Sequence, residues 1–225
     1  MSIDDPISVH EAAAALEIDE RTVRLMASAG EIEAVKRGNA WWLDPRSVER
    51  RRRQQPGRGR PLSAPMAWLV LLLASGIRGP GEPTGEDHRP ARARRWLDSH
   101  PLADFAPRLR ARARRESFDG HSSELPRLAA HQYVTRTGIS AADAVGVHGG
   151  PGDVELYAPV GRRPDLLAEH ALEPGDGPVL IRWVPDELWP LVAGDVAPRA
   201  AVLVDLLEHD DPRARREADR ALRRP

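Results

Sequence analysis

The chain has 225 residues, 41% of them hydrophobic, which is enough for a packed core in one large or two small domains. It has no cysteine, which excludes disulfides, thiolate catalysis and cysteine-ligated zinc. The net charge is −1, but residues 50–60 hold six arginines and no acid, residues 91–116 eight arginines and three acids, and residues 150–225 ten arginines and fifteen acids. This asymmetry indicates a basic side for nucleic acid and a less basic side for a partner. A GC-rich genome is an equally good explanation, since Lys36 is the only lysine.

No signal peptide opens the chain. The longest apolar run, residues 66–74, is about half as long as the ~20 residues that a membrane span needs. We therefore expect a soluble, cytoplasmic protein with no membrane partner.

Two short helices are predicted first. Ser8 and Glu11 form an S-x-x-E capping box ahead of an apolar stripe at helical spacing. Asp19 is a suitable N-cap for a second helix over about 20–29, which Gly30 ends. The inner face of that helix is small and apolar, and its other side carries Arg21, Thr22, Arg24, Leu25 and Ser28. A helix of this kind is typical of a DNA-recognition helix.

A hairpin and a third helix follow. Gly38-Asn39 is a turn dipeptide between two strand-like runs, with Lys36 and Arg37 just before it. Strand alternation puts Trp41 on the core face and Trp42 on the opposite face, free to lie against DNA or a neighbouring domain. The other interpretation is that Trp42 only covers the base of the hairpin.

Asp44-Pro45 then opens a helix with Val48 as its inward anchor. Arg50, Arg51, Arg52 and Arg53 end this helix, and residues 55–60 form a linker by composition. The arginine cluster is either a solvated helix end or a set of phosphate contacts. Its position straight after the hairpin favours phosphate contacts.

The rest of the chain predicts further helices and two strands. A helix over 64–75 is apolar nearly all round and must be buried by its own chain or by a partner; it is the candidate for dimer or interdomain packing. A Gly/Pro-rich loop over 79–89 precedes arginine-rich helices at about 91–98 and 104–116. Strands are predicted over 153–159 and 179–185, and helices over 162–170, 198–208 and 212–223. The fold class is therefore α+β, mainly helical.

Sites for chemistry are scarce in the sequence. The run HGGPG at 148–152 resembles an oxyanion-hole loop, but no G-x-S-x-G elbow accompanies it. The eight histidines lack metal-ligand spacing, and there is no phosphate-binding or dinucleotide-binding glycine motif. We expect no catalytic residue, no metal site and no cofactor.

The N-terminal run ISVHEAAAALEIDERTVRLMASAGEIEAVKRGNAWWLDPRSV, residues 7–48, resembles the excisionase/MerR-type winged helix-turn-helix. That family shows a V-x-E-A-A-x-x-L helix, an R-T-V recognition helix, a G-x-I/L-x-A-V strand and then R-G-x-x-W. The resemblance implies that Arg21, Thr22 and Arg24 enter the major groove, with Lys36, Arg37, Asn39 and Trp42 on the wing.

Residues 120–225 are similar to the C-terminal region of AbiEi-like antitoxins, through GHSSELPRLAAHQYVTRTGISAADAVG, VELYAPVGRRPDLL, VLIRWVPDELWPL and APRAAVLVDLLEHDDPRARREADRAL. Those proteins are encoded beside nucleotidyltransferase-like toxins in abortive-infection systems, and they repress their own operon. The resemblance implies a bacterial DNA-binding antitoxin and autorepressor, whose partners are double-stranded operator DNA and a nucleotidyltransferase-like toxin.

The expected domains are a winged helix-turn-helix at 1–54, a linker at 55–60, a helical connecting region at 61–119 and an α+β antitoxin-like domain at 120–225. A single winged module buries little surface, so we expect dimers or paired sites on DNA. Two alternatives remain open. One is a stand-alone regulator whose C-terminal domain senses a ligand or mediates oligomerisation, and the other is an enzyme or nuclease with a borrowed DNA-binding domain.

Overall fold

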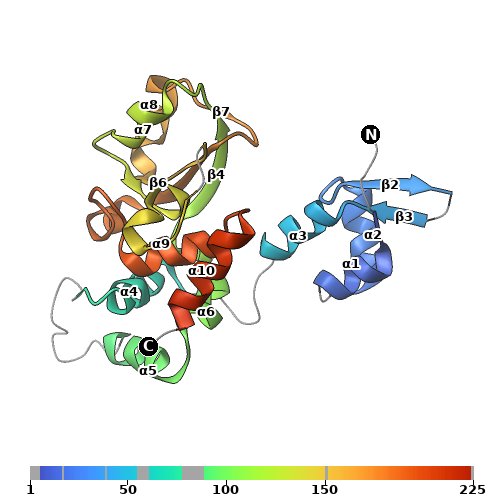
Figure 1. Cartoon of the computed structure of the whole chain (residues 1–225), viewed down its shortest axis with the longest axis horizontal. Helices are drawn as coiled ribbons and strands as arrows, with labels where there is room; N and C mark the ends of the chain where they lie inside the picture. Colours follow the sequence, from blue (N-terminus) through green and yellow to red (C-terminus); the bar gives the residue numbers. More distant parts are fainter. Residues whose placement is uncertain are drawn as a thin grey trace. The chain divides into compact units, whose positions relative to one another are not determined.

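A computed structural model describes residues 6–16, 18–38, 40–54, 61–77, 89–149 and 152–223, and in residues 50, 53 and 54 the backbone only. The chain divides into two compact units, Met1–Gly57 and Arg58–Pro225 (Figure 1). Each unit has a hydrophobic core of its own, so each can be understood from its own residues. Both contain helix and sheet, which confirms the mixed fold class.

The first unit packs three helices against a small antiparallel sheet of strand order β1-β3-β2. Its elements are β1 (Ile7–Ser8), α1 (Val9–Leu16), α2 (Glu20–Ser28), β2 (Ala34–Arg37), β3 (Ala40–Leu43) and α3 (Pro45–Gln54). Leu16, Val23, Ile32 and Leu43 are almost completely buried and form the centre of its core.

Side chains close in sequence fix the helix ends of this unit. The backbone N–H of Ser8 donates to Glu11 at 2.8 Å, and that of Glu11 donates to the Ser8 hydroxyl at 3.2 Å, which confirms the capping box. Asp19 accepts from the Thr22 backbone at 2.9 Å, as predicted for an N-cap. Asp44 accepts from the Ser47 backbone at 2.9 Å and so starts α3.

The second unit is built on a five-stranded sheet of order β5-β6-β8-β4-β7, in which β6 and β8 are parallel and the other pairs antiparallel. Its strands are β4 (Arg114–Asp119), β5 (Thr135–Arg136), β6 (Val154–Pro159), β7 (Glu173–Pro174) and β8 (Val179–Val184). Its α-helices are α4 (Ala64–Ala74), α5 (Arg89–Ser99), α6 (Leu102–Phe105), α7 (Leu125–Ala129), α8 (Arg163–Glu169), α9 (Arg199–Leu207) and α10 (Pro212–Arg223). Its 3₁₀ turns are η1 (Ala106–Arg108), η2 (Arg110–Arg112), η3 (Gly138–Ala141), η4 (Asp143–Val145), η5 (Val160–Arg162) and η6 (Asp186–Leu191).

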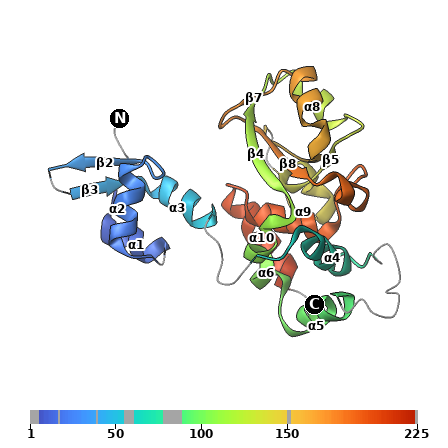
Figure 2. The same cartoon turned by 180° about the vertical axis from the view of Figure 1, so that it is seen from behind.

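The two faces of this sheet are covered by different helices. Leu156 of β6 and Ile181 of β8 pack in a core with residues of α7 and α8. Tyr157 of β6 and Val184 of β8, on the opposite face, belong to a larger core with α4, α5, α6, α9 and α10. Figures 1 and 2 show α7 and α8 at one end of the unit and α4 to α6 at the other. Strand alternation thus separates the two layers.

The apolar helix α4 is buried by its own chain. Trp68 and Leu71 have essentially no exposed surface, and the Trp68 indole donates to the carbonyl of Arg112 at 3.0 Å. Helices α4, α5 and α6, from the region expected to connect two domains (61–119), therefore contribute to the same core as α9 and α10. None of the described helices combines the length and the apolarity needed to cross a bilayer.

The prediction of a helix over 104–116 is wrong. This segment forms α6 and two 3₁₀ turns, and from Arg114 it becomes strand β4 between β8 and β7. Arginine and alanine favour helix locally, but Phe118 and Glu116 gain partners in the sheet: Phe118 is buried in its core, and Glu116 accepts from the Trp183 indole at 2.8 Å. Tertiary packing overrides helix propensity here.

Candidate functional sites

Helix α2 presents a mixed polar and apolar face to solvent. Arg21, Leu25 and Ser28 are exposed on one side of the helix, while Val23 and Ala27 are buried on the other. Leu25 is 59% exposed, which is unusual for a leucine in a helix whose inner face is well packed. Within the described part of the chain, Arg21 has no ion-pair partner. This face can offer hydrogen bonds and an apolar contact at once.

Two other predicted residues of α2 are engaged within the unit. The Arg24 guanidinium donates to Glu20 at 2.5 Å, and Glu20 also lies 3.2 Å from Nδ1 of His10. The Thr22 hydroxyl donates to Asp19 at 2.7 Å, which leaves its oxygen as an acceptor. The hydrogen bonds from His10 and Arg24 lower the pKa of Glu20. The hydrogen bonds from Thr22 lower the pKa of Asp19.

The hairpin of β2 and β3 carries cations on both faces. Lys36 pairs across the strands with Trp41, and its ammonium lies 5.8 Å from the centre of that ring. Arg37 is exposed, and Gly38 has φ +62°, which the turn requires and which a side chain would disfavour. Asn39 lies outside the described residues.

Trp41 and Trp42 lie on opposite faces of β3. Trp41 packs against the core of the first unit, on the face that also carries the buried Leu43. Trp42 is half-buried and stands opposite Ser8 on β1 and Val35 on β2. Part of the Trp42 ring therefore covers the sheet and part remains accessible.

The arginines of α3 differ in their contacts. Arg51 is paired with Glu31 at 3.0 Å, and Arg52 with Glu49 at 2.7 Å. Arg50 and Arg53 belong to the helix, and their side chains lie outside the described part. Arg46, which sequence reasoning passed over because it precedes the arginine run, is exposed and has no partner among the described residues.

The second unit contains a buried ionic network between the sheet and α9. Arg112 donates to Asp205, to Glu208 at 3.0 Å and to the Tyr157 hydroxyl at 2.9 Å. Arg182 lies 3.0 Å from Asp205 and 2.9 Å from Glu208. Both guanidinium groups are buried and each is satisfied, which a buried charge requires. These residues are far apart in sequence, and no local pattern signals them.

Glu155 completes this network from β6. Its carboxylate lies 3.5 Å from Arg182, and a Cβ on Gly138 would stand 1.6 Å from its Oε2. Burial raises the pKa of Glu155 to about 7, against the opposing effect of Arg182. The pKa of Glu208 falls to about 2: burial opposes the fall, but Arg112 and Arg182 outweigh it. None of the network residues lines either of the two clefts described below.

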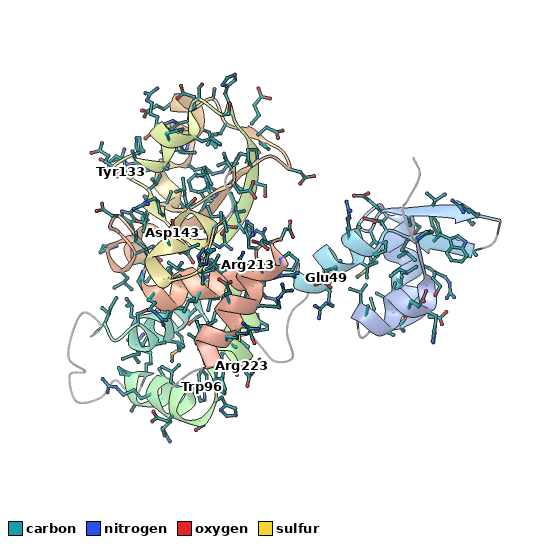
Figure 3. All side chains as sticks on the ribbon, viewed as in Figure 1. Glu49, Trp96, Tyr133, Asp143, Arg213 and Arg223 are labelled. Carbon is teal, nitrogen blue, oxygen red and sulfur yellow. The ribbon has the colours of Figure 1, made fainter. Side chains whose placement is uncertain are left out.

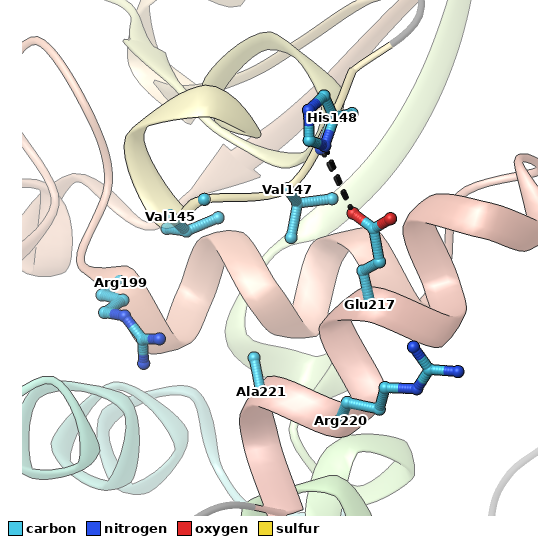
Figure 4. A pocket seen from close by; sticks show the side chains of 8 residues that line it. Val145, Val147, His148, Arg199, Glu217, Arg220 and Ala221 are labelled. Atoms are coloured by element: carbon cyan, nitrogen blue, oxygen red, sulfur yellow. Dashed lines mark hydrogen bonds and ion pairs between the residues drawn. The ribbon is translucent and has the colours of Figure 1, made fainter.

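A surface cleft of about 480 Å³ lies between the loop after η4 and helices α9 and α10 (Figure 4). Nδ1 of His148 lies 3.9 Å from the Glu217 carboxylate across its rim, and the backbone N–H of His148 donates to the same carboxylate at 3.3 Å. Arg199 and Arg220 also line the cleft, and neither has an ion-pair partner in the part of the chain described. The run HGGPG thus contributes a cleft-lining histidine, and its residues 150 and 151 lie outside the described ranges. A second cleft, beside α5 and α10, shares Arg199.

Comparison of the chain with known protein families, with curated proteins and with solved structures found no match.

Proposed function

We propose that the chain is a bacterial DNA-binding antitoxin and transcriptional autorepressor. In this proposal the first unit is a winged helix-turn-helix in which α2 enters the major groove and the β2–β3 hairpin is the wing. The second unit counters a nucleotidyltransferase-like toxin, and this half rests on the resemblance of residues 120–225 to AbiEi-like antitoxins.

The observation that carries DNA binding is the outward face of α2. Arg21 has the fork geometry that reads the O6 and N7 atoms of guanine, and an exposed leucine one turn away fits the methyl group of thymine. A leucine exposed to 59% has no role in the core of the unit. Contact with base edges would bury it, and burial of apolar surface is favourable.

Other exposed cations of the first unit would supply the phosphate contacts. Arg37 and Arg46 are exposed and without partners among the described residues, so they can bind phosphate at once. Arg24 and Arg52 would exchange exposed ion pairs with Glu20 and Glu49 for phosphate. Such pairs contribute roughly 0–1 kcal/mol, so the exchange costs little.

The DNA half of the proposal is tested with the full chain and labelled DNA from upstream of its own gene. Arg21→Ala should cost about 1–3 kcal/mol on the bound sequence and relax specificity at one base pair. Arg37→Ala should weaken binding to all sequences and reduce the salt slope by about 1. Arg216→Ala removes the same charge from the exposed surface of α10 and is the matched control. Equal losses for Arg21→Ala and Arg216→Ala on bound and random DNA would refute base reading by α2.

The antitoxin half is tested by growth of a host that expresses the adjacent open reading frame, alone and with this chain. Toxicity alone and rescue together would support the proposal. A harmless neighbour would refute it and leave DNA binding untouched.

A second candidate is a stand-alone regulator whose second unit binds a ligand. The cleft beside α9 favours it, because Arg199 and Arg220 line that cleft without ion-pair partners among the described residues. An anionic ligand that changes DNA affinity of the wild type, but not of Arg220→Ala, would distinguish it from the antitoxin.

A further inference from the structure

Helices α7 and α8 bring three metal-ligand side chains together on the sheet face opposite the ionic network. His131 follows α7, and Glu169 and His170 end α8. One ligand atom from each residue lies within 4.8 Å of the other two. Leu128 and Leu166, both buried in the core of this face, fix the two helices beneath the cluster. The 37 residues that separate His131 from Glu169 explain why spacing in the sequence gives no metal motif.

His170 is the anomalous member of the cluster. The residue is only 1% exposed, and neither ring nitrogen has a hydrogen-bond partner. Its Nδ1 lies 3.8 Å from a carboxylate oxygen of Glu124, too far for a hydrogen bond. A buried imidazole without partners loses the hydrogen bonds that it would make with water. A bound ion would give its nitrogen a partner again.

We infer that His131, Glu169 and His170 form a binding site for a divalent transition-metal ion, of which Zn²⁺ is the expected occupant. Two imidazoles and one carboxylate are a donor set that suits zinc, and imidazole nitrogens disfavour Mg²⁺ and Ca²⁺. Three protein ligands leave one position of a tetrahedral ion for water. The site does not depend on the proposed function.

The surroundings of the cluster prepare two of its ligands. Glu169 accepts from Arg127 at 3.1 Å through Oε1, which leaves Oε2 facing Nε2 of His131 at 3.3 Å. A bond of this kind orients a ligating carboxylate. The ring of His170 makes no hydrogen bond through either nitrogen, so a nitrogen lone pair is available to an ion.

Ligation requires small movements. A tetrahedral zinc ion with bonds of about 2.1 Å separates its ligand atoms by roughly 3.4 Å. Nε2 of His131 and Oε2 of Glu169 already lie 3.3 Å apart, so the distances that must shorten, by about 1 Å, are those to His170. Glu169, at the exposed end of α8, can move most easily. His131 Nδ1 accepts from the Tyr133 backbone at 3.2 Å, which places the ring proton on Nε2. Ligation through Nε2 moves that proton to Nδ1 and opens the Tyr133 contact.

The test is titration of the full chain, free of any polyhistidine tag and of bound metal, with Zn²⁺ by calorimetry. We expect one Zn²⁺ per chain and a rise of the melting temperature when it binds. Glu169→Gln, at an exposed position, and His131→Ala should each weaken binding at least about tenfold. His148→Ala, which removes an exposed histidine from the other side of the unit, should bind as the wild type does. Co²⁺ in the same site should give the visible bands of a four-coordinate ion.

Absence of saturable binding at one ion per chain would overturn the site. Unchanged Zn²⁺ affinity in both Glu169→Gln and His131→Ala would also overturn it, because the ion would then be held elsewhere. Mg²⁺ that competes with Zn²⁺ at equal concentration would contradict an imidazole donor set. Circular dichroism of each variant separates loss of the site from loss of the fold.

Discussion

Replacing Glu155 by glutamine should change how the stability of the second unit depends on pH. The carboxyl of Glu155 is buried, and burial raises its pKa from an ordinary value of 4.5 to about 7. The folded state therefore holds this proton more tightly than the unfolded state does. Stability associated with Glu155 is complete below pH 4.5 and is lost as the pH rises through 7. Each pKa unit corresponds to about 1.4 kcal/mol, so the full loss is about 3 kcal/mol.

Glutamine keeps the size of the side chain and removes this titration. Between pH 5 and 8.5, the free energy of unfolding of Glu155→Gln should gain about 2–3 kcal/mol relative to the wild type. Urea denaturation followed by tryptophan fluorescence measures it, because Trp68 and Trp183 are both buried in the second unit. Urea adds no ions that would screen the network.

Glu208→Gln is the matched control for this experiment. The pKa of Glu208 is lowered to about 2, so Glu208 is ionised in both folded and unfolded chains above pH 5. Its variant should be destabilised by nearly the same amount across the whole range. A Glu155→Gln difference that stays constant within about 0.5 kcal/mol would refute the raised pKa and the burial argument behind it.

Three other substitutions test the packing of the second unit. Gly138→Ala should destabilise it by about 2–4 kcal/mol, because φ is +48° and the new Cβ would meet Glu155. Gly146→Ala, at φ +75° with open space, is the control and should cost only about 1–2 kcal/mol. Equal losses for the two variants in urea denaturation would contradict the contact with Glu155. Asp205→Asn should cost about 3–5 kcal/mol by the same measurement, since it removes the negative charge that pairs with the buried guanidinium groups of Arg112 and Arg182. A loss below about 1 kcal/mol would show that the network is not buried in solution. Trp68→Ala should lower the free energy of unfolding by about 3–5 kcal/mol, and a small loss would mean that α4 is not part of this core.

The sequence predicts the first unit well because its signals are local. Capping by Ser8, Asp19 and Asp44 is encoded within four residues of each helix start, and all three caps are confirmed by hydrogen bonds. Strands β6 and β8 are also predicted from the sequence: β8 is rich in β-branched and aromatic residues, and β6 is mostly apolar with a tyrosine. Helix α4 was predicted with nearly its observed bounds, but sequence alone could not say what buries it.

Non-local features escaped prediction for a physical reason. Arg112 meets Asp205 across 93 residues and Tyr157 across 45, so nothing near Arg112 in the chain distinguishes it from an exposed arginine. The same holds for His131 and His170. The predicted helix over 104–116 runs into the first half of β4, because the partner strand β8 lies about 60 residues further along the chain and leaves no local signal. Local propensity competes with such contacts, and here the contacts prevail.

Arginine serves packing as well as charge in the second unit. In the run 91–116, Arg112 is buried, and Arg92 and Arg108 lie over the ring of Trp96 at 4.9 and 5.1 Å; Figure 3 labels that ring on α5. A planar guanidinium can pack against an aromatic ring, which lets arginine stabilise a fold as well as carry charge.

A count of charges along the sequence cannot distinguish these two uses. The excess of arginine in residues 91–116 indicated a basic surface, yet three of those side chains serve packing and a buried ion network. Arg21, Arg37 and Arg46 of the first unit have no ion-pair partner among the described residues, so they keep their charge available to an outside anion. When such a cation binds a phosphate of DNA, counterions are released, and this release favours binding. Arg199 and Arg220 of the second unit are also without ion-pair partners among the described residues, so cations available to an outside anion occur in both units, and only the contacts of each arginine tell them apart from the ones that stabilise the fold.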